Sequence, residues 1–248
     1  MGRTVARLAA ADASFQIIAG LDRSAAGQAP PEVPSLIDPA GAAAQLEAAD
    51  VVIDFSAPEF LQELLDAVAP IADPPAVVVG TTGLGPEEQE KLQAASARGA
   101  VLTAANFSVG VNLLLVLAER ATTALGAEFD VEIVETHHRR KEDAPSGTAL
   151  ALGEAVAAAR GVELDAVRRD GRSGRPGARR AEEIGFHALR GGDVVGDHHV
   201  HFIGDLERVE LVHRASDRAL FAAGALRAAR WIAGREPGRY SMRDVLGL

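Results

Sequence analysis

Short apolar segments alternate with helical segments through the first half of this chain, and this alternation restricts the possible folds more than any other feature. Near-continuous apolar runs at Val51–Phe55, Ala76–Gly80 and Val101–Ala105 have the length and composition of buried strands. Pro58–Val68 and Pro86–Ala97 separate these runs and have the composition of helices. Apolar strands that alternate with helices predict an α/β fold with a parallel sheet covered on both faces.

The flanking segments complete the first predicted domain. A helix is expected over residues 3–11, and Phe15–Gly20 is expected to form a further short, buried strand. Residues 24–41 are rich in Pro, Gly, Ala and Ser, which predicts a loop.

Polar and glycine residues follow several of these strands. In open parallel sheets, ligands bind beyond the carboxyl ends of the strands. Asp22 stands where dinucleotide sites place the partner of a ribose hydroxyl, and Arg23 beside it could meet a 2′-phosphate. A solvated charge pair and a simple glycine turn are the alternatives. The residues at these ends are Asp22, Arg23, Ser56, Gly80, Thr81, Thr82, Gly83, Asn106 and Phe107.

From Ser108 onward the pattern changes, which predicts a second domain. Val109–Leu125 has the composition of a mostly apolar helix, and a last, amphipathic helix is expected at Ala219–Ala233. Residues 160–180 are rich in Arg and Gly without an apolar period, which predicts a solvated loop that is mobile at its tip. Several strands that follow one another closely in sequence favour a sheet that is antiparallel in part. They are expected at Gly185–Leu189, Val194–Ile203 and Val209–Arg214.

The stretch Glu132–Ala149 concentrates the chemically active side chains. Apolar and polar residues alternate before it, which predicts a strand, and an Ala- and Leu-rich helix is expected from Thr148 to Ala159. The strand therefore delivers His137, His138 and Lys141 to a loop that ends at a helix N-terminus.

That helix N-terminus is itself suited to an anion. Ser146 stands where an oxygen cap is needed, directly after Pro145. The N–H groups of Gly147 and Thr148 have no intrahelical acceptor and favour negative charge. Cationic side chains beside these amides predict a pocket for a carboxylate or a phosphate.

Lys141 is conspicuous in a chain that uses arginine almost everywhere. Of the 25 basic residues only Lys91 and Lys141 are lysine, and Lys141 directly follows two arginines. A guanidinium keeps its proton at any accessible pH, whereas an ammonium can give its proton away. Chance is the alternative for one residue, but within this loop the lysine is interpreted as a proton donor.

Bulk composition excludes several classes of protein. The 248 residues suffice for one large domain or two ordinary ones. A net charge of −10 argues against general nucleic-acid binding, and the absence of cysteine excludes disulfides and thiolate chemistry. No signal-peptide pattern and no membrane-length apolar run are recognised, so a cytoplasmic protein without a membrane partner is expected.

Histidines raise the alternative of a metal site. Five of them could meet in space, but no cysteine and no carboxylate at ligand spacing accompany them, so zinc is disfavoured. They are interpreted instead as lining the substrate side or as satisfied within the second sheet. The five are His137, His138, His198, His199 and His201.

One segment resembles the signature of the dihydrodipicolinate reductase family, which has the form E-x-H-H-x-x-K-x-D-A-P-S-G-T-A. The segment is Glu135–Ala149, with the sequence E-T-H-H-R-R-K-E-D-A-P-S-G-T-A, and it matches every fixed position of that pattern. The likeness extends over essentially the whole chain. It includes Val51–Pro58, Gly80–Gly83, Ala104–Asn112, Gly192–His198 and Ser241–Leu248.

The resemblance implies a Rossmann-like nucleotide-binding domain over 1–108, completed by 217–248. It implies a second, mixed α/β domain for substrate binding and oligomerisation over 109–216, and a homotetramer. The implied reaction uses NADH or NADPH to reduce dihydrodipicolinate, or its 4-hydroxy-tetrahydro precursor, to tetrahydrodipicolinate. This small dicarboxylate belongs to diaminopimelate and lysine biosynthesis.

Site residues follow from the same resemblance. His137 and Lys141 match the catalytic acid–base pair, and His138 with the amides of Gly147 and Thr148 matches contacts to the substrate carboxylate. The positions that match cofactor contacts are Asp22, Arg23, Gly80, Thr81, Thr82, Ala104, Ala105, Asn106 and Phe107.

One departure concerns the N-terminus. The family opens with a buried strand and a loop of the form G-x-x-G-R-M-G-R, and this chain begins at Met1-Gly2-Arg3, within the tail of that motif. The missing strand would lie near the middle of the parallel sheet, and its loop would hold the pyrophosphate. Two alternative functions therefore stand beside the reductase: a non-catalytic or ligand-binding subunit with weak cofactor binding, and a reductase of another small dicarboxylate.

Overall fold

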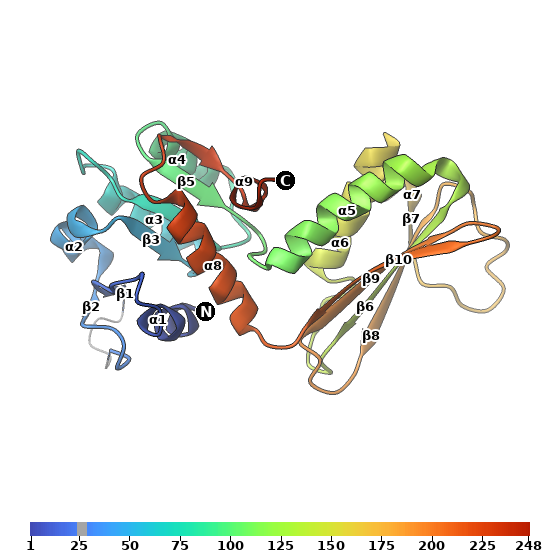
Figure 1. Cartoon of the computed structure of the whole chain (residues 1–248), viewed down its shortest axis with the longest axis horizontal. Coiled ribbons are helices and arrows are strands. Elements are labelled where there is room, and N and C mark those ends of the chain that lie inside the picture. The colour runs from blue at the N-terminus through green and yellow to red at the C-terminus, as the bar shows by residue number, and fades with distance from the viewer. Residues whose placement is uncertain (24–28) are drawn as a thin grey trace. The chain divides into compact units, whose positions relative to one another are not determined.

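The computed structural model describes residues 1–23 and 29–248 and divides into two compact units. The first unit comprises Met1–Val109 and Ala219–Leu248, and the second comprises Gly110–Arg218 (Figure 1). Residues 24–28, part of the predicted loop, lie outside the described residues.

A four-stranded, all-parallel sheet forms the centre of the first unit. Its order is β11-β5-β4-β3, so the predicted parallel sheet is confirmed. Three of the strands match the apolar runs of the sequence to within one or two residues. The strands are β3 (Val51–Asp54), β4 (Ala76–Val79), β5 (Ala100–Thr103) and β11 (Gly238–Tyr240).

Helices cover both faces of this sheet, which belongs to the α/β class as predicted. On one face, α3 (Pro58–Val68) and α4 (Pro86–Ser96) pack on the strands, and α2 (Ala43–Ala48) joins them. On the other face lie α8 (Ala219–Ile232) and α9 (Met242–Leu246). The buried residues of α3 recur at helical spacing, and each fully buried leucine contributes about 2 kcal/mol of hydrophobic stabilisation. They are Phe60, Leu61, Leu64, Leu65 and Val68.

The predicted buried strand at Phe15–Gly20 is wrong in most of its length. Only β1 (Gly20–Leu21) is paired, with β2 (Leu36–Ile37), and a 3-10 turn at Pro39–Gly41 follows. Ile18 is 36 % exposed, and α1 (Gly2–Ala10) precedes the segment. Among the described residues no strand lies beside residues 15–19 to complete their backbone hydrogen bonds, and a segment without a strand neighbour forms no ladder.

A cleft lies beside the outer edge of β3. It has a volume of about 690 Å³ and is lined by residues 14–22, by β3 and by side chains of α1 and α8. Within the described residues β3 pairs on one side only, with β4, so its other edge faces this cleft. The cleft therefore exposes the unpaired edge of β3.

The second unit is a five-stranded mixed sheet with helices on one face (Figure 1). Its order is β10-β9-β6-β8-β7, where β6 is parallel to β8 and antiparallel to β9. The predicted sheet of partly antiparallel style is confirmed. Its strands are β6 (Asp130–His137), β7 (Arg168–Asp170), β8 (Ile184–Arg190), β9 (Gly196–Ile203) and β10 (Arg208–Ala215).

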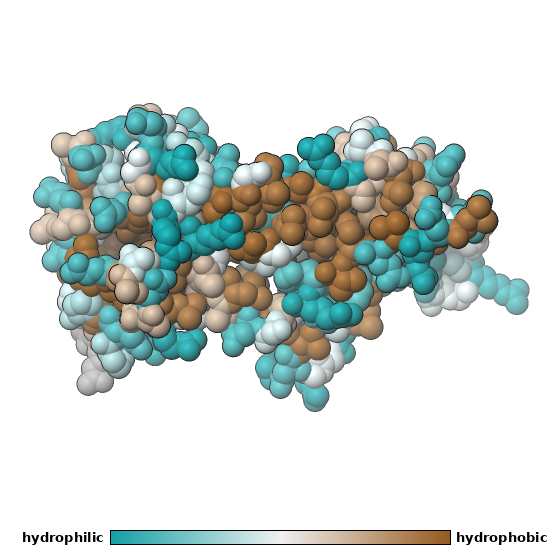
Figure 2. Space-filling model, in the orientation of Figure 1, coloured by the Kyte–Doolittle hydropathy of each residue, from teal (hydrophilic) through white to brown (hydrophobic). Residues whose placement is uncertain are grey.

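Two long helices bury one face of this second sheet. They are α5 (Val109–Leu125), followed by a 3-10 turn at Gly126–Glu128, and α6 (Gly147–Arg160). By length and composition alone, Val109–Glu128 could cross a membrane, a test that core helices also pass. Leu114 and Ala118 of α5 pack into the core, while Leu113 and Leu117 are exposed. Apolar surface is visible in the region of α5 (Figure 2).

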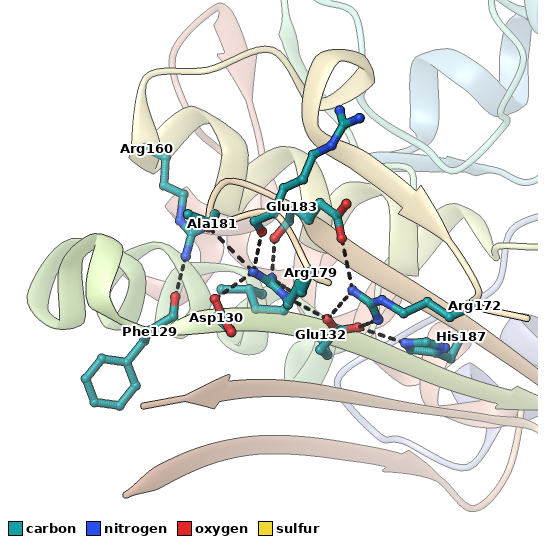
Figure 3. A network of polar contacts seen from close by, with 11 residues as sticks. Phe129, Asp130, Glu132, Arg160, Arg172, Arg179, Ala181, Glu183 and His187 are labelled. Atoms are coloured by element: carbon teal, nitrogen blue, oxygen red, sulfur yellow. Dashed lines mark hydrogen bonds and ion pairs between the residues drawn. The ribbon is translucent and has the colours of Figure 1, made fainter. Parts of the chain in front are cut away.

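The segment predicted as a loop over 160–180 contains more structure than expected. A short helix, α7 (Leu164–Val167), leads into β7, which pairs with β8, so the prediction of a loop is wrong there. The tip at residues 172–178 is exposed, as predicted. Arg172 and Arg179 fold back onto Glu132 of β6, whose second oxygen also meets His187 (Figure 3).

This network of charges is strong enough to set the protonation state of Glu132. Burial alone would raise the pKa of the carboxyl, but hydrogen bonds from Arg172, His187 and Arg179 outweigh burial and lower its pKa from 4.5 to about 2. Glu132 therefore stays ionised and ties the 172–179 segment to the sheet.

Candidate functional site

Period-two alternation along β6 sends two glutamates to opposite faces of the sheet. Val131, Ile133 and Glu135 are buried toward α5 and α6, while Glu132 lies on the other face. The strand ends at His137, which is in register with Arg190 of β8. Glu135 and His137 therefore emerge on one face, at the end of the strand that enters the loop.

Glu135 is the buried centre of this site. It is 1 % exposed, and its two oxygens accept hydrogen bonds from four donors. Arg190 donates to both oxygens, at 2.7 and 2.8 Å, the ring nitrogen Nδ1 of His137 lies 2.6 Å from Oε2, and the N–H of Ser146 lies 3.1 Å from Oε1. Burial would raise the pKa of Glu135, but hydrogen bonds from Arg190 and His137 outweigh it and lower the pKa.

His137 is held by these contacts at the end of β6. Its Nδ1 faces a carboxylate, which can only accept, so Nδ1 carries a proton and Nε2 is the nitrogen left for other partners. The ring also meets His198 edge-on, with centroids 5.2 Å apart. Gly196 lies against the ring, because a Cβ at that position would stand 2.9 Å from Nε2.

His198 belongs to the same cluster but has a different role. It is 4 % exposed, and its Nε2 lies 3.0 Å from the hydroxyl of Ser146. Burial, then the charge of His137, lowers the pKa of His198 from 6.5 to about 4, so this imidazole is neutral near pH 7. It therefore supports the helix cap without carrying charge.

Ser146 fixes the start of α6. Its hydroxyl accepts from the N–H of Ala149 at 3.2 Å, as the sequence predicted for the cap, while its own N–H is held by Glu135. Gly147 is exposed and Thr148 half-buried in the first turn that follows. The N-terminal end of α6 is thus anchored to the same carboxylate that holds His137.

Lys141 stands in the loop between β6 and α6. Its ammonium group lies 2.8 Å from both oxygens of Asp143, whose pKa is lowered by this hydrogen bond. Arg190 donates to the carbonyl of Asp143 at 2.7 Å, which links the loop to Glu135. The backbone carbonyl of His138 accepts a hydrogen bond from the N–H of Lys141. The side-chain Nδ1 of His138 is buried and has no hydrogen-bond partner among the described residues.

The structure thus brings five sequence-predicted site residues onto one loop and its two ends. It adds two side chains that sequence reasoning did not single out, Glu135 and Arg190. Glu135 could have been found, because it precedes His137 by two residues on a strand and so shares its face. Arg190 could not, because it comes from strand β8. Ser146, expected as the helix cap, and His198, expected on the substrate side or within the second sheet, join the same cluster.

The predicted cofactor residues lie in the first unit, after β4 and β5. Thr82 and Ala105 are exposed, while Gly80, Ala104 and Asn106 are half-buried. The amide oxygen of Asn106 accepts from the N–H of Ser108 at 2.8 Å. These positions share the carboxyl-end edge of the parallel sheet.

Two of the predicted cofactor residues have structural partners. Thr81 is 7 % exposed, donates its hydroxyl to Asp54 and accepts the N–H of Ser56 at 3.0 Å, so it joins the ends of β3 and β4. Phe107 is 1 % exposed and packs edge-on against Phe55 at 5.3 Å. Their side chains serve the core, so any contact that they make with a cofactor would come from their backbone groups.

Asp22 and Arg23 follow β1 and are exposed. The N–H of Asp22 donates to the carbonyl of Ile37, and Asp22 also lines the cleft beside β3. Arg23 lies 3.8 Å from Glu63, with both side chains about half exposed, a geometry that contributes little free energy. Arg23 therefore remains able to change partner.

Metal binding receives no support from the described part of the chain. No group of three or more His, Cys, Asp or Glu side chains there is arranged to hold an ion. His199 and His201 stack with ring centroids 5.9 Å apart, and Glu210 lies 3.4 Å from His201.

Comparisons with known proteins agree with this arrangement. The profile described as dihydrodipicolinate reductase, N-terminus, matches residues 1–107, and the one described as dihydrodipicolinate reductase, C-terminus, matches residues 110–246. A 4-hydroxy-tetrahydrodipicolinate reductase of Thiobacillus denitrificans is 49 % identical over 255 residues, which cover 100 % of this chain and 95 % of the relative. One of Alkalilimnicola ehrlichii is 54 % identical over 205 residues, 83 % of this chain and 76 % of the relative.

A solved structure supports the fold independently. Dipicolinate-bound dihydrodipicolinate reductase from Paenisporosarcina sp. TG-14 superimposes with a TM-score of 0.76 at 23 % identity, over 97 % of this chain and 92 % of that one. The two family profiles match both units, and the relatives are about 50 % identical to the chain, so both comparisons identify the same family. The chain belongs to the dihydrodipicolinate reductase family.

Proposed function

We propose that this chain reduces 4-hydroxy-tetrahydrodipicolinate, or dihydrodipicolinate derived from it, to tetrahydrodipicolinate with NADH or NADPH. The observation that carries the proposal is the loop between β6 and α6, in which Glu135 fixes His137 beside a lysine-bearing turn and a capped helix N-terminus. The relatives named as 4-hydroxy-tetrahydrodipicolinate reductases support the choice of substrate.

A dicarboxylate suits this loop for electrostatic reasons. The N–H of Gly147 in the first turn of α6 favours a carboxylate, and the buried, unpartnered Nδ1 of His138 can donate to one. Lys141 adds a cationic group nearby in the chain. Together they offer charge-assisted hydrogen bonds to a doubly anionic ring.

The residues act on the substrate through proton supply and charge stabilisation. When bound, the nicotinamide supplies the hydride. Reduction of a conjugated imine leaves negative charge that must be protonated, and an ammonium such as that of Lys141 is a suitable donor. Its proton passes from Nζ to the substrate, and the imidazole of His137 stabilises the developing charge when Nε2 carries a proton in addition to Nδ1. Lys141 leaves Asp143 in this step, because the anionic substrate replaces that carboxylate as its partner.

The first unit provides positions for the cofactor. Thr82 and Ala105 are exposed at the carboxyl ends of β4 and β5, and Gly83, with φ of 75°, leaves open space beside them. With the backbone of residues 80–82 and 104–107, these positions fit a nucleotide laid across the edge of the sheet. Asp22 would meet a ribose hydroxyl and Arg23 a 2′-phosphate, so the pair accommodates either nucleotide.

The test measures oxidation of NADH and of NADPH with freshly prepared substrate. Wild type should turn over, while Lys141→Ala and His137→Ala should each lose roughly 10²- to 10⁴-fold in kcat with an unchanged circular dichroism spectrum. Lys91→Ala is the matched control, because it removes the only other lysine, which pairs with Asp66 in the first unit. Unchanged turnover in both loop variants would exclude the assigned roles.

The same assay separates the alternatives. A non-catalytic subunit would bind dipicolinate in calorimetry but oxidise neither nucleotide. A reductase of another small dicarboxylate would oxidise NAD(P)H only when that other compound is supplied.

A further inference from the structure

We propose that Glu135, clamped by Arg190, is the positioning residue for His137: it selects the protonated ring nitrogen and fixes the ring so that Nε2 is the nitrogen presented to the substrate. The inference rests on the proposed function, in which His137 touches the substrate. Glu135 itself is buried and acts only through the imidazole.

The hydrogen bonds at Glu135 occupy its acceptor sites, so it has no acceptor site for a ligand. A carboxylate offers about four lone-pair sites, and here two N–H groups of Arg190, the ring of His137 and the N–H of Ser146 fill four of them. At 1 % exposure and with a lowered pKa it remains an ionised acceptor. It therefore cannot bind a ligand or exchange protons with one.

An ionised acceptor determines the state of the ring it faces. Because Glu135 can only accept, Nδ1 of His137 must be the protonated nitrogen, whether the ring is neutral or charged. The ring is then held in one plane by a bond of 2.6 Å. Arg190 supplies the compensating charge, without which a buried carboxylate would be costly.

Arg190 extends the same control to the loop. One of its nitrogens bonds to Glu135 and also to the carbonyl of Asp143, two residues beyond Lys141. Since Glu135 also holds the N–H of Ser146, both ends of the loop that carries Lys141 depend on one ion pair. These loop contacts are to main-chain groups of Asp143 and Ser146, whereas at His137 Glu135 contacts a catalytic side chain directly.

Gly196 provides independent support from the other side of the ring. The three atoms nearest to a Cβ built at this glycine all belong to His137, at 2.9, 3.4 and 3.7 Å. Gly196 is buried in β9, and a side chain there would meet the imidazole first. The ring is therefore enclosed between the carboxylate and a glycine that allows close approach.

The first test is Glu135→Gln, which keeps the shape and removes the charge. An amide cannot accept from all four donors, so the ring loses its fixed tautomer. We expect kcat to fall about 10- to 100-fold while KM for the dicarboxylate changes by less than about threefold, because a support residue acts mainly on orientation in the transition state. Partial recovery of kcat is expected in Glu135→Asp, which restores the charge with a shorter reach.

Glu132→Gln is the matched control. Glu132 lies on the same strand and also accepts from two arginines and a histidine (Figure 3). It lies on the opposite face of the sheet from Glu135. It should leave kcat unchanged even where it lowers thermal stability. Equal losses of kcat in the two variants would show a general effect of strand stability and overturn the proposal.

Gly196→Ala tests the position of the ring without touching the ion pair, in case Glu135→Gln fails to fold. The added methyl must displace the imidazole, so kcat should fall about 10-fold with little loss of stability, because a 1 Å misplacement in a catalytic group costs up to about 10²-fold. Full activity in Gly196→Ala would count against a fixed ring.

A spectroscopic readout keeps this inference distinct from the proposed function. In nitrogen NMR of labelled histidine, the resonances lost in His137→Ala should report a protonated Nδ1 in wild type and a mixture of tautomers in Glu135→Gln. An unchanged tautomer would overturn the positioning role even if the chain turns over no substrate.

A double variant completes the separation. Adding Glu135→Gln to His137→Ala should cost no more than about twofold in kcat, because residues that act through one another are not additive. A further loss of 10-fold or more would refute action through His137. Full activity in His137→Ala alone would instead refute the proposed function.

Discussion

Two carboxylates on one strand do similar electrostatic work for different ends. Glu132 and Glu135 each accept hydrogen bonds from arginine and from a histidine, and each has a lowered pKa. Glu132 ties the 172–179 segment to the outer face of the sheet, whereas Glu135 ties the loop of Lys141 to the face under the helices. Because side chains alternate between faces along β6, Glu132 and its stabilising partners lie on one face, and Glu135 with its partners in the candidate site lies on the other.

His198 should make stability fall as the pH drops below 6.5. Its pKa in the folded state is about 4 against an ordinary 6.5, so the unfolded chain binds the proton first and the folded state loses its advantage as pH falls. Between pH 7.5 and pH 5 this histidine should contribute a loss of about 2 kcal/mol in the free energy of unfolding.

Urea unfolding of wild type and His198→Gln at the two pH values measures this contribution. The variant should lose about 2 kcal/mol less than wild type over the interval. His201→Gln, a half-buried histidine on the same strand, serves as the control. Identical pH dependence in His198→Gln and wild type would show that His198 is not held neutral.

Asp143 should restrain Lys141 rather than take part in the reaction. The carboxylate is 64 % exposed, so Asp143→Asn should change the free energy of unfolding by no more than about 1 kcal/mol. It frees the ammonium group, and we expect KM for the dicarboxylate to fall by about two- to fivefold, because one negative charge no longer competes for Lys141. Steady-state kinetics at low and high salt measures this; a raised KM would contradict it.

At the scale of elements, the outer edge of β3 is unpaired among the described residues of the first unit. It faces the cleft of about 690 Å³, which is also lined by residues 15–19, outside any helix or strand. One parallel strand in this cleft would supply hydrogen bonds to both neighbours, and the loop after it would place amides at the pyrophosphate.

Extending the chain upstream by a strand and a G-x-x-G loop should therefore tighten NADH binding. We expect Kd, measured by fluorescence titration, to fall at least about 10-fold, and Tm to rise, because the edge of β3 becomes paired. An extension of equal length in which the glycines are replaced by alanine is the control for the loop. No change in Kd would show that an added strand and glycine loop do not contribute to NADH binding.

At the scale of the molecule, we expect self-association through the outer face of the second sheet. Among the described residues no helix covers this face, and Leu189, Ile203 and Val212 on it are 49 %, 37 % and 41 % exposed. Apolar side chains exposed on an uncovered sheet face are what a protein interface would bury. The predicted homotetramer would bury it.

Val212→Asp should therefore reduce the mass of the assembly. Light scattering after size exclusion is expected to give a tetramer for wild type and smaller species for the variant, since an unpaired charge in an interface core is costly. Leu248→Asp, with 48 % exposure in the first unit, is the control. A monomeric wild type would refute the assembly.

Features with local causes were predictable from the sequence. The helices α3 and α5 agree with their predicted bounds, because apolar spacing and helix starts are encoded within a few residues. The Ser146 cap also follows from its own short segment. Family membership was predictable too, because the motif over Glu135–Ala149 is contiguous.

Features that depend on pairing were decided only by the tertiary structure. Phe15–Gly20 has the composition of a buried strand, yet a strand needs a neighbour, and apolar composition does not supply one. Arg190 and His198 stand more than fifty residues beyond their partners, and the register of β8 and β9 against β6 brings them there. By itself the sequence determined the helices and strands with local signals and the reactive loop. The contacts that hold His137 arise from strand register, because hydrogen bonds between distant residues form only once the sheet exists.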